Sequence, residues 1–148
     1  MNTEKTNELL RGGQFLVKES VCEDIFTPED FTEEQRMMKE AVMAFNEREI
    51  IAYKDRFENK DFALTEEVMR KAGALGFLGV AVPEAYGGLG MGFVSTLLTC
   101  DYISSGTGSF STAFGAHTGI GTLPITLYGT EEQKQKYVPK LAIGEWFG

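Results

Sequence analysis

The stretch from Gly76 to Gly92 constrains the fold of this chain more than any other part of the sequence. It joins two segments of helical pattern through a short apolar run, a proline and several closely spaced glycines. A helix cannot continue through Pro83, because proline has no amide hydrogen to donate and its ring clashes with the preceding turn. The glycines permit backbone angles that other residues resist. We therefore predict a specified, irregular connection between two helices.

Helix signals on both sides of this connection predict an all-α fold. Thr32 to Gln35 and Thr130 to Gln133 both have the form of a capping box, with threonine at the N-cap and glutamine three residues later. We predict an orthogonal or up-and-down bundle of about six helices without paired strands. The helices are expected from Thr32 to about Tyr53, from a Thr65 cap to Leu75 with Gly76 as its stop, from Phe93 to Ser104, from Phe110 to Ala116, from Pro124 to Gly129, and from Thr130 to Gly144 with a kink at Pro139.

The first 30 residues are predicted to be separate from the helical domain, which is expected to span residues 31–148. Gly12 and Gly13 break any long helix in this region. Two alternatives remain open for it: an extended arm laid on the domain, or a partly disordered segment.

Composition excludes several functional classes. A net charge of −8 disfavours nucleic acid as a partner. No apolar run approaches the roughly 20 residues that a membrane helix needs. Cys22 and Cys100 are isolated thiols without metal or redox spacing. With Glu4 and Glu8 near its start, the sequence has no signal-peptide pattern, and we expect a cytoplasmic protein in a reducing compartment.

The residues themselves indicate little catalysis. His117 is the only histidine, and it has no carboxylate beside it in the sequence. We interpret it as a packing or capping residue and assign no metal site. The glycines from Gly87 to Gly92 lack the spacing of a dinucleotide fingerprint, so a tight turn between helices is the better interpretation.

Two long blocks resemble the N-terminal helical domain of acyl-CoA dehydrogenases. They run from Gly76 to Gly90 and from Tyr128 to Glu145, in the order and separation of that family. The resemblance covers about residues 31–148, and Gly115-Ala116-His117 is similar to the very-long-chain branch.

This resemblance implies that the chain is one domain of three in an FAD-dependent enzyme of fatty-acid β-oxidation. Such enzymes remove hydrogen from the α- and β-carbons of an acyl-CoA and pass the electrons to electron-transferring flavoprotein. In the family, the main flavin site and the catalytic glutamate belong to the other two domains. We therefore assign no catalytic or cofactor-binding residue to this chain, and expect it to be inactive alone. Trp146 and Phe147, near the end of the chain, also suggest that more chain follows.

The resemblance also implies that this domain forms one wall of the acyl-chain cavity. The wall segment corresponds to Ser111 to Thr122. In medium-chain enzymes, bulky polar side chains one helical turn apart close the cavity. Here those positions are Ser111 and Gly115, or Thr112 and Ala116, and all four residues are small. This predicts a deep cavity and a long-chain substrate, although small residues also allow close packing of helices.

Two other functions remain open at this point. The chain could be a free-standing helical interaction module without flavin, or part of an acyl-CoA oxidase, in which oxygen accepts the electrons. In each case an exposed apolar face is expected to favour a homo-oligomer.

Overall fold

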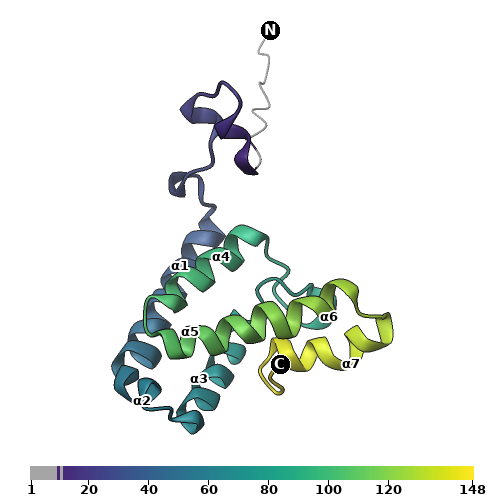
Figure 1. Cartoon of the computed structure of the whole chain (residues 1–148). Coiled ribbons are helices and arrows are strands. Elements are labelled where there is room, and N and C mark those ends of the chain that lie inside the picture. The colour runs from purple at the N-terminus through teal and green to yellow at the C-terminus, as the bar shows by residue number, and fades with distance from the viewer. Residues whose placement is uncertain (1–9, 11) are drawn as a thin grey trace. The chain divides into compact units, whose positions relative to one another are not determined.

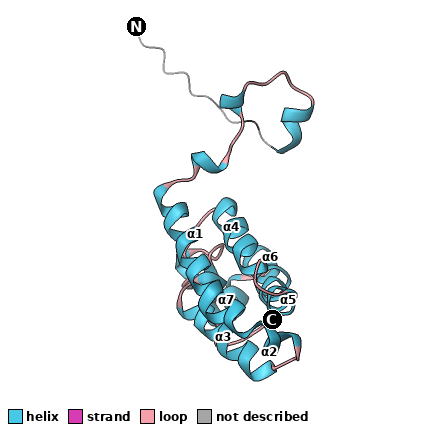
Figure 2. Ribbon diagram, turned by 90° about the vertical axis from the view of Figure 1, so that its left-hand side faces the viewer, coloured by secondary structure: helices cyan, strands magenta, loops and turns pink. Residues whose placement is uncertain are grey.

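The computed structural model describes residue 10 and residues 12–148. These residues form helices, turns and loops, and no strand is assigned among them (Figure 2). The chain divides into two compact units, residues 1–34 and 35–148. The domain boundary that we predict after residue 30 stays a prediction. The α-helices are α1 (Glu33–Phe45), α2 (Lys54–Glu58), α3 (Phe62–Ala74), α4 (Phe93–Ser104), α5 (Gly108–Gly115), α6 (Leu123–Tyr128) and α7 (Glu131–Ala142).

In the first unit, the described residues form three short 3-10 turns: Gly12–Leu16, Cys22–Asp24 and Pro28–Asp30. The carboxylate of Asp30 accepts a hydrogen bond from the backbone amide of Thr27 at 2.8 Å, which closes the last of these turns.

Two helical segments of the second unit contain a π-helical turn. The π turn η4 (Asn46–Ile50) interrupts the single helix that we predict from Thr32 to Tyr53, and a short 3-10 turn, Ile51–Tyr53, follows it. The π turn η8 (Ala116–Thr122) joins α5 to α6, so one helical run extends from Gly108 to Tyr128 (Figure 1). The predicted helix from Phe110 to Ala116 is thus only the first part of this run.

The start of α3 corrects a prediction. The N-cap is Asp61, whose carboxylate accepts a hydrogen bond from the backbone amide of Leu64 at 3.0 Å. Thr65, the predicted cap, lies inside the helix and donates its hydroxyl proton to the Asp61 carbonyl at 3.0 Å. Aspartate caps a helix as well as threonine does, and the earlier start adds a turn that carries the buried Leu64.

The predicted ends of the helices near the glycines are confirmed. Helix α3 stops at Ala74, and Gly76 has the left-handed φ of 83° that favours glycine. Thr130 and Gln133 form a reciprocal capping box at the start of α7. That helix runs through Pro139 and ends at Ala142, before Gly144 with φ of 73°.

The connection between α3 and α4 is held by its own backbone. The amides of Leu89, Gly90 and Met91 donate hydrogen bonds to the carbonyls of Gly79, Val82 and Val80 at 2.8–2.9 Å. A Cβ at Gly88 would overlap the carbonyl oxygen of Val82, so this crossing requires glycine. The prediction of a specified connection is confirmed.

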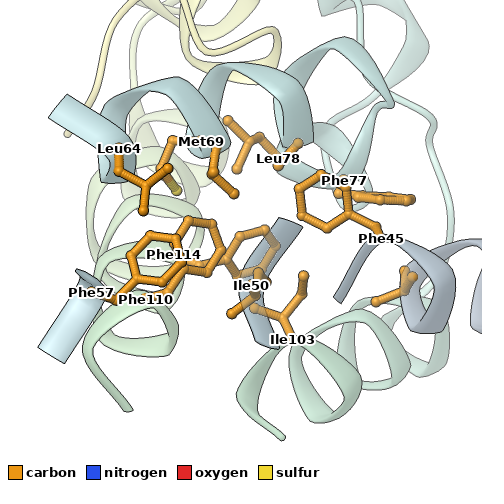
Figure 3. Close-up of a cluster of buried hydrophobic side chains, with 13 residues drawn as sticks. Phe45, Ile50, Phe57, Leu64, Met69, Phe77, Leu78, Ile103, Phe110 and Phe114 are labelled. Atoms are coloured by element: carbon orange, nitrogen blue, oxygen red, sulfur yellow. The ribbon is translucent and has the colours of Figure 1, made fainter. Parts of the chain in front are cut away.

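The main core lies where α1, α3, α4 and α5 meet (Figure 3). Phe45 packs edge-on against Phe77 with ring centroids 5.4 Å apart, and Phe57 packs against Phe110 at 5.3 Å. A smaller cluster of Val82, Val138 and Ala142 attaches the connection to α7. The two clusters hold both ends of the connection in place beside the helical run from α5 to α6.

Candidate functional site

An apolar groove lies beside the helical run from α5 to α6. Its volume is about 210 Å³, and helix α4, the connection and the helical run supply its walls. We call it the α4–α5 groove. Its aliphatic and aromatic lining comes from Phe77, Leu78, Val80, Ala81, Val82, Phe93, Leu97, Phe114 and Leu123, with Gly115 and Gly119 between them, and Cys100 and five threonines complete it. It has no charged side chain in its lining.

Four of the five threonines direct their hydroxyl protons back to their own helices. Each donates to the carbonyl of the fourth residue before it, at 2.8 to 3.4 Å. These are Thr96, Thr99, Thr118 and Thr126. With its hydroxyl proton committed to the backbone, each of these threonines offers no free donor to the groove.

Thr122 differs from these four residues. Only 2% of its surface is exposed, and its hydroxyl has no hydrogen-bond partner in the described part of the chain. It is the last residue of η8. The groove therefore contains one buried, unpaired polar group in a lining that is otherwise apolar or internally paired.

The four predicted wall residues lie in different surroundings. Gly115 lines the groove, and no atom would lie within 4 Å of a Cβ built on it. Ser111 is half-buried and shares a hydrogen bond of 2.8 Å with Ser104. Thr112 is exposed and donates to the carbonyl of Gly108 at 2.8 Å, while Ala116 is half-buried. Neither Thr112 nor Ala116 lines the groove, so the structure separates the two candidate registers onto different faces.

His117 is a buried structural residue, in agreement with its interpretation from the sequence. Its Nε2 atom lies 3.0 Å from the carbonyl oxygen of Leu141, near the end of α7. Burial lowers the pKa of this imidazole, and the hydrogen bond to Leu141 opposes that shift.

Burial raises the pKa of the Cys100 thiol, which lines the groove and is half-buried, so this thiol stays protonated near neutral pH. Cys22 and Cys100 are both free. No group of three or more potential metal ligands occurs among residue 10 and residues 12–148. In the same residues, no helix is long and apolar enough to cross a membrane.

Most of the groove was not predicted from the sequence. Phe93, Leu97 and Gly119 belong to it, but they lie on segments whose approach depends on the whole fold. One signal was available: Thr118, Thr122 and Thr126 are spaced by four residues, which places them on one side of a helix.

Comparison with known proteins identifies the family. The family described as "Acyl-CoA dehydrogenase, N-terminal domain" matches residues 32–145. A "Probable acyl-CoA dehydrogenase" of Bacillus subtilis (strain 168) is 43% identical over 141 residues, covering 95% of this chain and 24% of that protein. A mitochondrial isovaleryl-CoA dehydrogenase of Solanum tuberosum is 35% identical, covering 80% of this chain and 29% of that protein.

A solved structure agrees with this match. The acyl-CoA dehydrogenase of Bacillus anthracis, complexed with FAD, superimposes with a TM-score of 0.87 at 42% identity. The match covers 94% of this chain and 24% of that one, so the chain spans about a quarter of the length of these Bacillus proteins. The chain belongs to the acyl-CoA dehydrogenase family, in which it corresponds to the N-terminal helical domain.

Proposed function

We propose that this chain belongs to an FAD-dependent acyl-CoA dehydrogenase and forms one helical wall of its acyl-chain cavity. The observation that carries the proposal is the α4–α5 groove, because its apolar lining includes Gly115 on the segment that resembles the cavity wall. The reaction removes a proton from the α-carbon and a hydride from the β-carbon of the acyl group. FAD supplies the hydride acceptor when it is bound, and electron-transferring flavoprotein is the proposed next acceptor.

The proposed task of this chain is to bind and desolvate the acyl group. Its groove has no ionisable side chain apart from the protonated thiol of Cys100, so it offers no base for the α-proton. It also has no cationic side chain to pair with the pyrophosphate of FAD, and the groove residues do not fit that part of the cofactor. We therefore expect the base and the main flavin contacts to come from other parts of the enzyme. Alone, the chain should neither bind FAD nor oxidise acyl-CoA.

The small residues of this wall favour a long acyl chain. Gly115 and Gly119 are one helical turn apart in the groove, and a Cβ on either would meet no atom within 4 Å. Ala116 belongs to the other candidate register, on the same helical run but outside the groove. Whichever of these faces forms the wall, a larger side chain on it should shorten the preferred substrate.

A chimera tests the proposal. Residues 32–145 replace the equivalent segment of the Bacillus subtilis relative, and kcat/KM is measured with palmitoyl-CoA and butyryl-CoA. We expect the chimera to prefer palmitoyl-CoA. Gly119→Leu or Ala116→Leu, depending on the face, should lower kcat/KM for palmitoyl-CoA about tenfold relative to butyryl-CoA. Gly108→Leu, outside the groove, serves as the matched control.

Two results would contradict the proposal. One is a folded chimera that oxidises no acyl-CoA while the unmodified relative does. The other is a preference for butyryl-CoA, which would contradict the long-chain assignment alone. Oxygen consumption without an added acceptor would identify the reaction as that of an oxidase.

A further inference from the structure

The unpaired hydroxyl of Thr122 requires an explanation. A buried polar group without a partner destabilises a fold, and the large majority of such groups in proteins are hydrogen-bonded. Thr122 is 2% exposed, lines the α4–α5 groove and has no partner in the described part of the chain. Asn46 is the other described residue with an unpaired buried side-chain atom, and it lies outside the groove.

The π turn accounts for the difference between Thr122 and the other groove threonines. In an α-helix, a threonine hydroxyl can donate to the carbonyl four residues earlier, as those of Thr118 and Thr126 do. Residues 116–122 follow the wider π-helical spacing, which changes the position of that carbonyl relative to the side chain. Such π turns occur frequently at functional sites. Here the turn leaves one hydroxyl of the groove uncommitted.

The rest of the groove limits what can bind beside this hydroxyl. A cavity of about 150 Å³ lined by apolar side chains is large enough to bind benzene. The groove, at about 210 Å³, has room for a short aliphatic chain or a small ring. Its lining has no charged side chain, which disfavours an ionised group at this position. A trapped water needs two to four polar partners, and four of the five threonine hydroxyls already donate their protons elsewhere.

We propose that the α4–α5 groove binds an uncharged, chain-like apolar ligand that carries one hydrogen-bonding oxygen, and that the Thr122 hydroxyl recognises this oxygen. A carbonyl or ether oxygen accepts the Thr122 proton, and a ligand hydroxyl can also donate to Thr122 Oγ1. The apolar lining contacts the remainder of the ligand. Binding does not depend on the flavin chemistry; only the identification of the ligand as an acyl chain rests on the proposed function. The substrate class would then be an acyl-CoA whose chain bears an oxo or hydroxy group.

Ligand binding to this chain itself tests the proposal. We would titrate it with 2-heptanone and with 1-chlorohexane, a chain of similar length without a strong acceptor, and follow the threonine methyl signals by NMR. The Kd is compared between the wild type, Thr122→Val, which keeps the shape of the side chain, and Thr122→Ser, which keeps the hydroxyl.

We expect both ligands to shift the methyl signals of the groove threonines. Thr122→Val should weaken 2-heptanone binding about three- to tenfold and change 1-chlorohexane binding less than twofold. Thr122→Ser should retain most of the affinity for 2-heptanone. Thr118→Val is the matched control, because its hydroxyl already donates to Phe114, and it should leave the ratio of the two affinities unchanged.

Three results would overturn the proposal: equal effects of Thr122→Val on both ligands, no effect on either, or methyl shifts confined to residues outside the groove. Because the chimera described above measures turnover, it can fail while this binding experiment succeeds, and the reverse also holds. The two proposals are therefore contradicted by different results.

Discussion

The Nδ1 atom of His117 accepts a hydrogen bond from the backbone amide of Gly148 at 3.2 Å. Because Nδ1 is the acceptor, Nε2 must carry the proton that bonds to the Leu141 carbonyl at 3.0 Å. The Phe147 ring packs edge-on against the imidazole, with centroids 5.6 Å apart. The neutral imidazole thus joins η8 to the end of α7 and to the segment that follows it. Protonation of Nδ1 would place a second donor against the Gly148 amide.

We predict that the stability of the chain falls as His117 is protonated. Burial lowers the pKa of His117 in the folded state, so the unfolded chain takes up this proton first as the pH falls. The free energy of unfolding should be level above the unfolded pKa of about 6.5, and should then decrease by at most about 1.4 kcal/mol per pH unit. The decrease ends below the lowered pKa of the folded state. Urea unfolding at several pH values between neutrality and mild acid measures this change.

A His117→Phe variant is the control for this prediction. The chain has one histidine, and the pKa values of Glu58, Asp61 and Glu131 are lowered, chiefly by hydrogen bonds, so these carboxylates titrate at more acidic pH. The variant should lose the pH dependence in this window. An equal slope in the wild type and the variant would assign the effect to other groups.

Substitution of Gly88 should strongly destabilise the chain. A Cβ at this position would overlap the carbonyl oxygen and the Cβ of Val82, within a backbone crossing fixed by three hydrogen bonds. Gly88→Ala should lower the free energy of unfolding by about 1–3 kcal/mol or more. Gly108→Ala, where a Cβ meets no atom within 4 Å, should be neutral or slightly stabilising. Chemical denaturation of both variants measures the difference, and equal stabilities would show that the crossing can relax.

Thr122→Val should stabilise the chain in the absence of ligand. It removes a buried hydroxyl that has no partner in the described residues, which should raise the free energy of unfolding by about 1 kcal/mol. Thr118→Val, which removes a hydroxyl bonded to the Phe114 carbonyl at 2.9 Å, should lower it by up to about 1 kcal/mol. If both variants lose stability equally in thermal or urea unfolding, the Thr122 hydroxyl has a partner such as a buried water.

The exposed apolar side chains of the helical run from α5 to α6 predict self-association. Ile120 is 80% exposed and Leu127 is 58% exposed. Association would cover this surface, so we expect sedimentation velocity to detect species larger than a monomer, and Ile120→Glu to reduce them. Met37→Glu, at a similarly exposed residue of α1, is the matched control. Monomeric sedimentation of the wild type at every concentration would contradict the prediction.

The parts of the fold that were predicted correctly depend on local signals. Helix α4 has the predicted bounds, and the Thr130 capping box and the glycines at 76 and 144 mark helix ends as expected. In each case the signal and its structural effect lie within a few residues.

The parts that were missed depend on competition or on distant contacts. Asp61 and Thr65 are both acceptable caps, and the burial of Leu64 favours the earlier start. The π turns have no simple sequence signature, yet η8 determines which residues of the helical run line the groove. The predicted wall residues illustrate this: Gly115 lines the groove, while Thr112 and Ala116 do not.

The measurement that tests the central claim most directly is the flavin absorbance of the chimera that carries residues 32–145 in the Bacillus subtilis relative. The account predicts that the purified chimera contains FAD and that acyl-CoA added without oxygen bleaches its absorbance, whereas the 148-residue chain alone shows neither property. A folded chimera that binds no flavin, or whose flavin acyl-CoA does not reduce while that of the unmodified relative is reduced, would contradict it.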